Sequence, residues 1–176
     1  MSKLVSIVVN CYNGDKYLKK NLESIQNQKY QNWELIFWDN QSTDNSKRIL
    51  ESFKEPRFKY FYAKKHTTLY EARTSACKKC NGEFIAFLDC DDWWYEDFLS
   101  SREDFFQNQK YGFSYSKFHY FFEKSDKFEI NYNNELPSEK IYDFLSRNYL
   151  VAISSLVIKI DLLRKINYFN NEFNII

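Results

Sequence analysis

The chain has 176 residues, and its 25 Lys and Arg against 24 Asp and Glu leave a formal net charge of +1. Hydrophobic residues make up 44%, which predicts one domain with a packed core. The balanced charge offers no clustered basic face, so no nucleic-acid partner is expected, and no apolar run approaches the length of a membrane span.

Four short, mostly apolar runs in the first half have the length and content of strands, and the nearly continuous first run suits a strand that is buried on both faces. They are residues 4–9, 33–38, 58–62 and 83–88. A polar turn and a segment with helical spacing follow each of the first three runs. This alternation predicts an α/β fold with a mostly parallel central sheet and helices on both of its faces.

Capping signals predict where two of the intervening helices begin. Ser42 or Thr43 would be the N-cap of the helix that follows the second strand. Thr68 and Glu71 form a capping box for the helix that follows the third strand, which we expect to run to about Cys80.

The second half of the chain has a different pattern. We predict a helix over 94–107, an aromatic-rich strand over 113–122 that pairs with 128–132, a helix over 138–147, a strand over 155–160 and a helix over 162–166. The aromatic strand could border a groove or an interface, but packing in the core is favoured because large aromatics dominate cores. No linker or repeat divides the chain, so a single domain over residues 1–176 is predicted.

The cysteines and the start of the chain favour a cytoplasmic protein. No signal peptide is expected, because Ser2 and Lys3 lead straight into a short strand. Cys77 and Cys80 form a single C-x-x-C, whereas a structural zinc site usually needs two such pairs. Reduced thiols that pack against a helix are therefore favoured over metal binding.

Three carboxylates, Asp89, Asp91 and Asp92, follow directly on the fourth apolar run. Carboxylates this close together repel one another, and a divalent cation would relieve the repulsion. Mg²⁺ and Mn²⁺ prefer oxygen ligands, typically one or two carboxylates together with substrate phosphates. The alternative is a solvated turn in which Asp91 or Asp92 caps the next helix.

Other polar side chains fall at the same edge of the predicted sheet, where parallel α/β folds bind ligands. Tyr12 and Asn13 follow the first strand, and Asp39 closes the second. Tyr12 could stack on a base, Asp39 could accept a hydrogen bond from a base or ribose, and Arg73 could pair with a diphosphate. Edge packing, an Asx turn and a surface arginine are the respective alternatives. No glycine-rich phosphate loop and no nucleophile motif is present.

Four segments in this order resemble the family-2 glycosyltransferases, which have the GT-A fold. They are residues 5–13 (VSIVVNCYN), 33–46 (WELIFWDNQSTDNS), 71–73 (EAR) and 82–92 (GEFIAFLDCDD). The resemblance implies a GT-A-like, Rossmann-related sheet, with a nucleotide-sugar-binding half over 1–92 and a partial acceptor-side half over 93–176. Asn40, Gln41 and Thr74 depart from the family pattern, and Gln41 replaces a glycine at a turn where glutamine tolerates positive φ poorly.

The resemblance also assigns roles, all of them expectations. Mn²⁺ or Mg²⁺ would neutralise charge on the departing nucleoside diphosphate. The implied contacts are Tyr12 and Asn13 with the base pocket, Asp39 with the nucleobase, Arg73 with the base or diphosphate, Asp89 with the ribose or sugar, Asp91 with the metal, and Asp92 with the sugar or a metal-bound water.

The end of the chain bears on activity. Residues 154–173 resemble the family stretch that precedes an acidic pair, one member of which is the general base. We therefore expect the base just beyond Ile176 and do not assign that role to Glu172. The hypothesis is a chain that binds donor and transfers sugar poorly or not at all.

The expected reaction is inverting transfer from a nucleoside-diphosphate sugar, with a UDP-sugar favoured, to a glycan or lipid-linked acceptor. A lipid acceptor would place the protein peripherally at the inner face of the membrane. Two alternatives stay open, a non-catalytic nucleotide-sugar-binding module and a nucleotidyltransferase. The second lacks the glycine-rich basic loop that such enzymes usually carry after the first strand.

Overall fold

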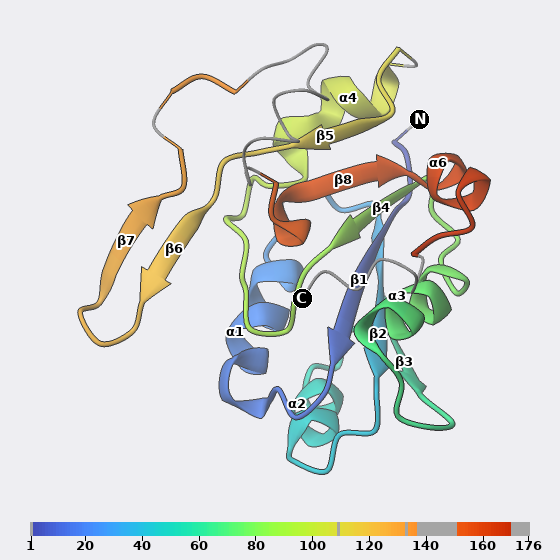
Figure 1. Cartoon of the computed structure of the whole chain (residues 1–176), viewed down its shortest axis with the longest axis vertical. Helices are drawn as coiled ribbons and strands as arrows, with labels where there is room; N and C mark the ends of the chain where they lie inside the picture. Colours follow the sequence, from blue (N-terminus) through green and yellow to red (C-terminus); the bar gives the residue numbers. More distant parts are fainter. Residues whose placement is uncertain (1, 109, 133, 137–150, 170–176) are drawn as a thin grey trace.

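The computed structural model describes residues 2–108, 110–132, 134–136 and 151–169 (Figure 1). Its central sheet has the strand order β3-β2-β1-β4-β8-β5. The first four are parallel, and β8 and β5 add antiparallel pairings at one side. The strands are β1 (Val5–Cys11), β2 (Trp33–Asp39), β3 (Phe58–Tyr62), β4 (Phe84–Phe87), β5 (Phe113–Tyr115) and β8 (Leu156–Lys159). The predicted α/β class and mostly parallel sheet are confirmed.

Helices cover both faces of this sheet, as predicted. Ile7 on β1 packs in a cluster with residues of α1 (Asp15–Gln26), α2 (Ser46–Ser52) and α4 (Glu103–Gln107). Val8, the next residue, packs in a second cluster with residues of α3 (Leu69–Cys77) and α6 (Ile160–Lys165). Successive strand residues point to opposite faces, so a strand that is covered on both sides must be apolar throughout.

A two-stranded ribbon stands apart from the main sheet (Figure 1). It pairs β6 (His119–Phe122) with β7 (Lys127–Ile130) in antiparallel register. The predicted strand over 113–122 is therefore wrong as a single element, because β5 pairs with β8 while β6 pairs with β7. The core prediction for its aromatics is also wrong, since Tyr120 is 48% exposed and Phe122 is 45% exposed.

The predicted helix over 94–107 forms only in its last part, as a 3-10 turn (Ser100–Arg102) followed by α4. Two side chains, one on α1 and one just after it, bond to the backbone before that turn. Ser24 Oγ accepts from the backbone N–H of Trp94, while Gln28 donates to the carbonyl of Tyr95 and accepts from the N–H of Leu99. These bonds satisfy backbone groups of a segment that forms no regular helix before Ser100.

Helix starts were predicted with mixed success. The capping box of Thr68 and Glu71 is present and opens α3, which ends at Cys77, three residues short of the expected end. The N-cap prediction for α2 is wrong, because the N-cap is Asn45 and it makes no side-chain cap. Two predicted features, the helix over 138–147 and Glu172, lie outside the described residues. No helix in the described part of the chain is long and apolar enough to cross a bilayer.

Candidate functional site

The turns after β1 and β2 are joined by hydrogen bonds around Asn13. Its backbone N–H donates to Ser42 Oγ over 3.0 Å, and its side-chain Oδ1 accepts from the N–H of Thr43 over 2.8 Å. Asn13 has a φ of 53°, in the left-handed region that asparagine tolerates better than most residues. Ser42 and Thr43, the predicted helix caps, are thus used to fix the two turns against each other.

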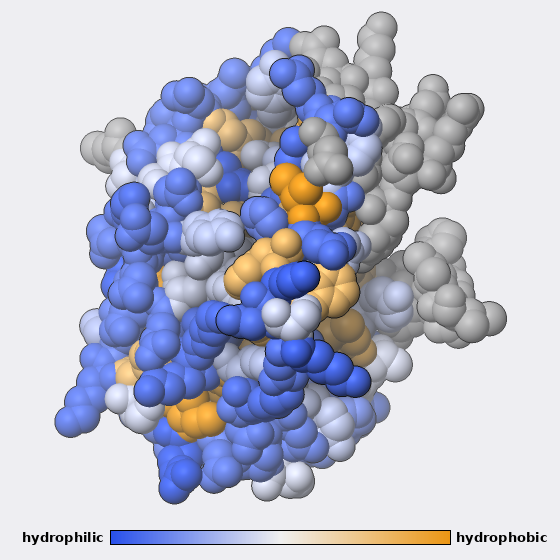
Figure 2. All heavy atoms as spheres, turned by 90° about the vertical axis from the view of Figure 1, so that its left-hand side faces the viewer, coloured by the Kyte–Doolittle hydropathy of each residue, from blue (hydrophilic) through white to orange (hydrophobic). Residues whose placement is uncertain are grey.

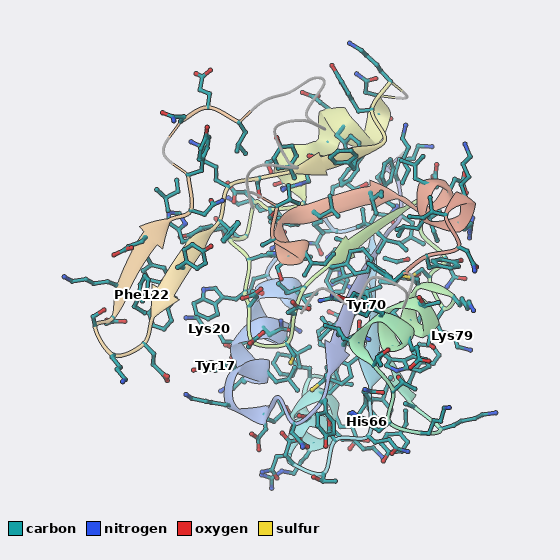
Figure 3. All side chains as sticks on the ribbon, in the orientation of Figure 1. Tyr17, Lys20, His66, Tyr70, Lys79 and Phe122 are labelled. Carbon is teal, nitrogen blue, oxygen red and sulfur yellow. The ribbon has the colours of Figure 1, made fainter. Side chains whose placement is uncertain are left out.

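Tyr12 presents its ring at the surface of this edge. It is 54% exposed, and its ring centroid lies 4.4 Å from that of His66. His66 lies at the end of the sheet toward which β1 and β2 run (Figure 3), with its Nδ1 2.9 Å from the carbonyl oxygen of Asn40. That contact requires a proton on Nδ1, because a carbonyl only accepts. His66 is a member of this edge that the sequence did not single out.

Asp39 is held by the protein itself. Its side chain is nearly inaccessible at 1% exposure, its Oδ1 accepts from the N–H of Ser42, and its Oδ2 accepts from the hydroxyl of Tyr60. Burial and the bond to Asp39 raise the pKa of the Tyr60 hydroxyl. Gln41, in the same turn, adopts a φ of 73°, which is the conformation that favours glycine. The Asp39 side chain therefore bonds within its own turn, which is the alternative to ligand binding that the sequence offered.

Arg73 and Asp89 meet although they come from different elements. Arg73 Nη2 lies 2.6 Å from Asp89 Oδ1, and the arginine is largely buried in α3. Thr68 and Glu71 form the capping box that opens α3, the helix that carries Arg73. Two of the predicted site residues are thus brought into direct contact.

Two residues that the sequence did not single out hold the loop after β4. Asn21, buried on α1, donates from Nδ2 to the carbonyls of Asp89 and Asp92 over 2.9 and 2.8 Å. Ser154 Oγ accepts from the N–H of Asp89 and donates to Asp92 Oδ2. A signal for Asn21 was available, since it is a polar residue at a helix position between the buried Leu18 and Leu22.

The three carboxylates of this loop have different surroundings. Asp89 pairs with Arg73, and Asp92 bonds to Ser154. Desolvation, together with the charges of Asp91 and Asp89, raises the pKa of the Asp92 carboxyl against the lowering effect of the Ser154 hydroxyl. Asp91 is exposed and makes no hydrogen bond or ion pair with the described residues. It is the carboxylate of the loop that is open to a cation.

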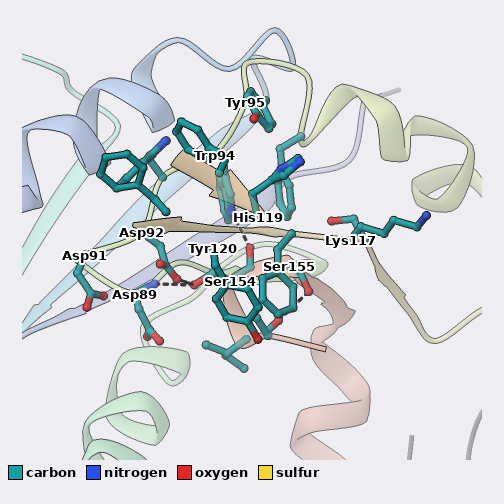
Figure 4. Close-up of a pocket in the computed structure, with 18 of the residues that line it drawn as sticks. Asp89, Asp91, Asp92, Trp94, Tyr95, Lys117, His119, Tyr120, Ser154 and Ser155 are labelled. Carbon is teal, nitrogen blue, oxygen red and sulfur yellow. Dashed lines mark hydrogen bonds between the residues drawn. The ribbon is translucent and has the colours of Figure 1, made fainter. Parts of the chain in front are cut away.

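A cavity of about 760 Å³ opens beside this loop (Figure 4). Asp89, Asp91 and Asp92 line it, together with the ribbon and the segment before the 3-10 turn. Aromatic residues contribute to its wall more than any other kind, and they include Trp93, Trp94, Tyr95, Phe98, Phe118, Tyr120, Phe121 and Phe128. The other predicted site residues, Tyr12, Asn13, Asp39 and Arg73, do not line it. The loop after β4 therefore separates two regions, the strand-end turns on one side and the aromatic cavity on the other.

Arg102 is a buried cation in the wall of this cavity. It is 5% exposed, its guanidinium carbon lies 3.8 Å from the centroid of the Phe98 ring, and Nη2 donates to the carbonyl of Ser155. Desolvation lowers its pKa to about 10, so the guanidinium keeps its charge at neutral pH. It forms no ion pair with the described residues, and its Nε–H has no partner among them. Sequence reasoning missed this residue.

Comparison with known proteins gives one family. The model of the family described as glycosyl transferase family 2 matches residues 6–165. A glucosyltransferase from Escherichia coli, UDP-Glc:alpha-D-GlcNAc-diphosphoundecaprenol beta-1,3-glucosyltransferase WfaP, is 33% identical over 159 residues, which cover 89% of this chain and 61% of the relative. The chain thus spans about three fifths of the length of this relative.

Two solved structures show the same fold at low identity. The mannosyltransferase PcManGT from Pyrobaculum calidifontis, in complex with GDP-Man and Mn2+, has a TM-score of 0.72 and 18% identity, covering 97% of this chain and 48% of its own. S. aureus TarS 1-349, in complex with UDP-GlcNAc, has a TM-score of 0.70 and 18% identity, covering 94% and 48%.

Proposed function

Because the chain belongs to glycosyl transferase family 2, we propose that it binds the nucleoside-diphosphate sugar in a metal-dependent, inverting sugar transfer to a glycan or lipid-linked acceptor. One observation carries the proposal. In the loop after β4, Arg73 engages Asp89 and Ser154 engages Asp92, which leaves the exposed Asp91 free of both. Such a loop offers one carboxylate to a cation and keeps a guanidinium beside it for a diphosphate.

A divalent metal fits this loop if the loop carboxylates and the phosphates of the ligand hold it together. The described residues contain no group of three or more side chains that could hold a metal alone. Mg²⁺ and Mn²⁺ are commonly held by one or two carboxylates together with substrate phosphates. Desolvation is the main cause of the raised pKa of Asp92, and the charges of Asp91 and Asp89, which a cation would offset, add to it. When bound, the metal would neutralise charge on the leaving diphosphate.

The strand-end turns would hold the nucleoside. Tyr12 has an exposed ring on which a base can stack. The base would either take the place of His66 against this ring or stack beside the two rings. Asn13 would shape the turn that carries this ring. Both carboxylate oxygens of Asp39 already accept a hydrogen bond, one from the N–H of Ser42 and one from the Tyr60 hydroxyl. Asp39 would therefore contact the nucleobase only if one of these oxygens accepted a second hydrogen bond. A UDP-sugar is favoured, in line with the UDP-Glc named for the E. coli relative and the UDP-GlcNAc bound by TarS.

The aromatic cavity would receive the acceptor. Its rings offer flat apolar faces to a sugar, and its carboxylates lie at the end nearest the donor. Arg102 supplies a buried positive charge that an anionic part of an acceptor would compensate. The E. coli relative is named for a diphospho-linked acceptor, and a lipid-linked acceptor would place the reaction at the cytoplasmic face of the membrane.

The test is thermal stabilisation of the chain by UDP, GDP, CMP and dTDP, each with and without Mn²⁺. A nucleotide present at about one hundred times its dissociation constant should stabilise the fold by roughly 2.7 kcal/mol. The Asp91→Ala variant should lose the metal-dependent part of that gain. Asp97→Ala, which removes another exposed carboxylate of the same cavity, should keep it. If none of the nucleotides stabilises the wild type, the donor-binding proposal is wrong.

A further inference from the structure

Two cysteines lie beside the carboxyl ends of neighbouring strands. β1 and β4 pair in parallel with Val8 opposite Phe87, and the N–H of Leu88 donates to the carbonyl of Val8 over 3.0 Å. Cys11 is the last residue of β1, and Cys90 lies in the turn that begins after the end of β4. Both residues are free thiols, and Cys90 is partly exposed.

Contacts around Gly14 confirm that the two sulfurs are close. A Cβ placed on Gly14 would lie 2.8 Å from Cys90 Sγ and 3.0 Å from Cys11 Sγ, so both atoms border the same small space. The two sulfurs are therefore near enough for a small movement of the turn that carries Cys90 to join them.

We propose that Cys11 and Cys90 form an oxidation-sensitive dithiol site, which a hydroperoxide converts into a reversible intramolecular disulfide. One sulfur attacks the peroxide O–O bond, which breaks to release water or an alcohol and leaves a sulfenic acid. The second sulfur then displaces that hydroxyl as water, and the S–S bond forms. Two electrons pass from the thiols to the peroxide, and both thiol protons end on oxygen.

The bond would act on the donor-binding loop, a consequence that rests on the proposed function. Cys90 stands between Asp89 and Asp91, and Cys11 directly precedes Tyr12. In the reduced form Cys11 is also bonded to the Ser46 hydroxyl over 3.4 Å. A disulfide would replace these contacts and fix the carboxylates of the loop relative to Tyr12. Metal-dependent nucleotide binding should therefore weaken on oxidation and return on reduction.

The chain supplies its own comparison pair. Cys77 and Cys80 are both buried, and they pack in the cluster that contains Val8, whereas Cys11 packs in the cluster that contains Ile7. Cys77→Ser and Cys80→Ser are thus the matched controls for Cys11→Ser and Cys90→Ser.

The decisive experiment is disulfide mapping of the wild-type chain after treatment with hydrogen peroxide in slight excess. Proteolysis without reductant should release a peptide pair that joins Cys11 to Cys90 and has lost two hydrogens, and dithiothreitol should separate it. Cys11→Ser or Cys90→Ser should abolish the pair, whereas the two control variants should keep it. A joined pair at Cys77 and Cys80 alone, or over-oxidised Cys90 without any joined peptide, would overturn the proposal.

Nucleotide binding is then compared in the reduced, oxidised and re-reduced protein. At least a tenfold loss of affinity on oxidation, restored by dithiothreitol, is expected, and unchanged affinity in the fully oxidised protein would overturn the coupling to the loop. If the reduced protein binds no nucleotide, the proposed function fails, while the mapping still decides whether the disulfide forms.

Discussion

The first 92 residues and the ribbon side of the molecule use the same kinds of side chain in opposite ways. In the first region β1, β2 and β4 are buried on both faces, and even a carboxylate, Glu34, is enclosed. In the second region the ribbon of β6 and β7 leaves Tyr120, Phe122, Phe128 and Ile130 exposed. Figure 2, which views the molecule from that side, shows apolar side chains gathered within a largely polar face.

This difference suggests that the first 92 residues contribute most of the stability and that the ribbon contributes mainly to recognition. The ribbon contacts the rest of the chain through few groups, among them Glu123, which pairs with Lys16 and Tyr17 of α1. Lys20 of α1 also lies 3.5 Å from the ring centroid of Trp93 and faces the ribbon (Figure 3). Removing apolar surface from the ribbon should therefore change the free energy of unfolding far less than disturbing the sheet.

The largest expected effect is the substitution Gly82→Ala. A Cβ there would lie 2.7 Å from Leu4 O and Ser6 N, which are backbone atoms that cannot move without disrupting β1. We expect a loss of about 3 kcal/mol or more in the free energy of unfolding, measured by urea denaturation. Gly112→Ala is the matched control from the second half, because its Cβ would meet only the end of the Leu162 side chain. Equal losses in the two variants would contradict the comparison.

A smaller effect is expected at Glu34, whose carboxylate joins three segments of the first region. It accepts from Ser6 Oγ over 2.6 Å, from the N–H of Asn81 over 2.7 Å and from Lys59 Nζ. Burial by itself raises the pKa of this carboxyl, but hydrogen bonds from Lys59, Ser6 and Asn81 together lower it, from 4.5 to about 2. Glu34→Gln should therefore cost roughly 2 kcal/mol at neutral pH.

The pH dependence of that loss has a definite sign. Because the pKa of Glu34 is depressed in the folded state, its stabilising contribution is complete above pH 4.5 and disappears as the pH falls toward about 2. The difference in unfolding free energy between wild type and Glu34→Gln should shrink across that window. The exposed Glu51→Gln serves as control and should show no such window. A difference that stays constant down to pH 2 would refute the assignment.

How far the sequence predicts this molecule follows from the same contrast. β1, β2 and β4 were predictable because burial on both faces leaves a local signature, a mostly apolar run. The segment 94–99 was not predictable, because its backbone groups bond to Ser24 and Gln28, partners distant in sequence. The aromatics of 113–122 were misjudged because composition does not say which side of a strand is covered.

The candidate site divides in the same way. Asp89 and Arg73 could be named from the sequence because ordered motifs carry them, and the structure brings them together. Asn21 and Ser154 could not be given their roles, since each acts on the loop after β4 from another element. Asp39 shows the limit of a motif, because its oxygens are occupied by Ser42 and Tyr60. The turn at Ser42 was an alternative that the sequence offered, whereas no local pattern reveals the contact with Tyr60.

The smallest effect on stability should come from the ribbon, where Tyr120→Ala and Phe122→Ala form a matched pair. Both rings are nearly half exposed, at 48% and 45%, but only Tyr120 lines the aromatic cavity. Each substitution should change the free energy of unfolding by less than about 0.5 kcal/mol.

Their effects on acceptor binding should differ, because only one ring can contact a ligand in the cavity. For a soluble sugar diphosphate with a short alkyl chain, Tyr120→Ala should weaken binding by about three- to tenfold, the equivalent of one aromatic contact. Phe122→Ala should leave the dissociation constant within about twofold of the wild type by calorimetry. Equal weakening in both variants would mean that the probe binds the outer face of the ribbon, and no weakening in either would mean that the cavity does not take the acceptor. Comparing the two variants therefore tests whether the ribbon recognises ligand through the cavity or only exposes apolar surface.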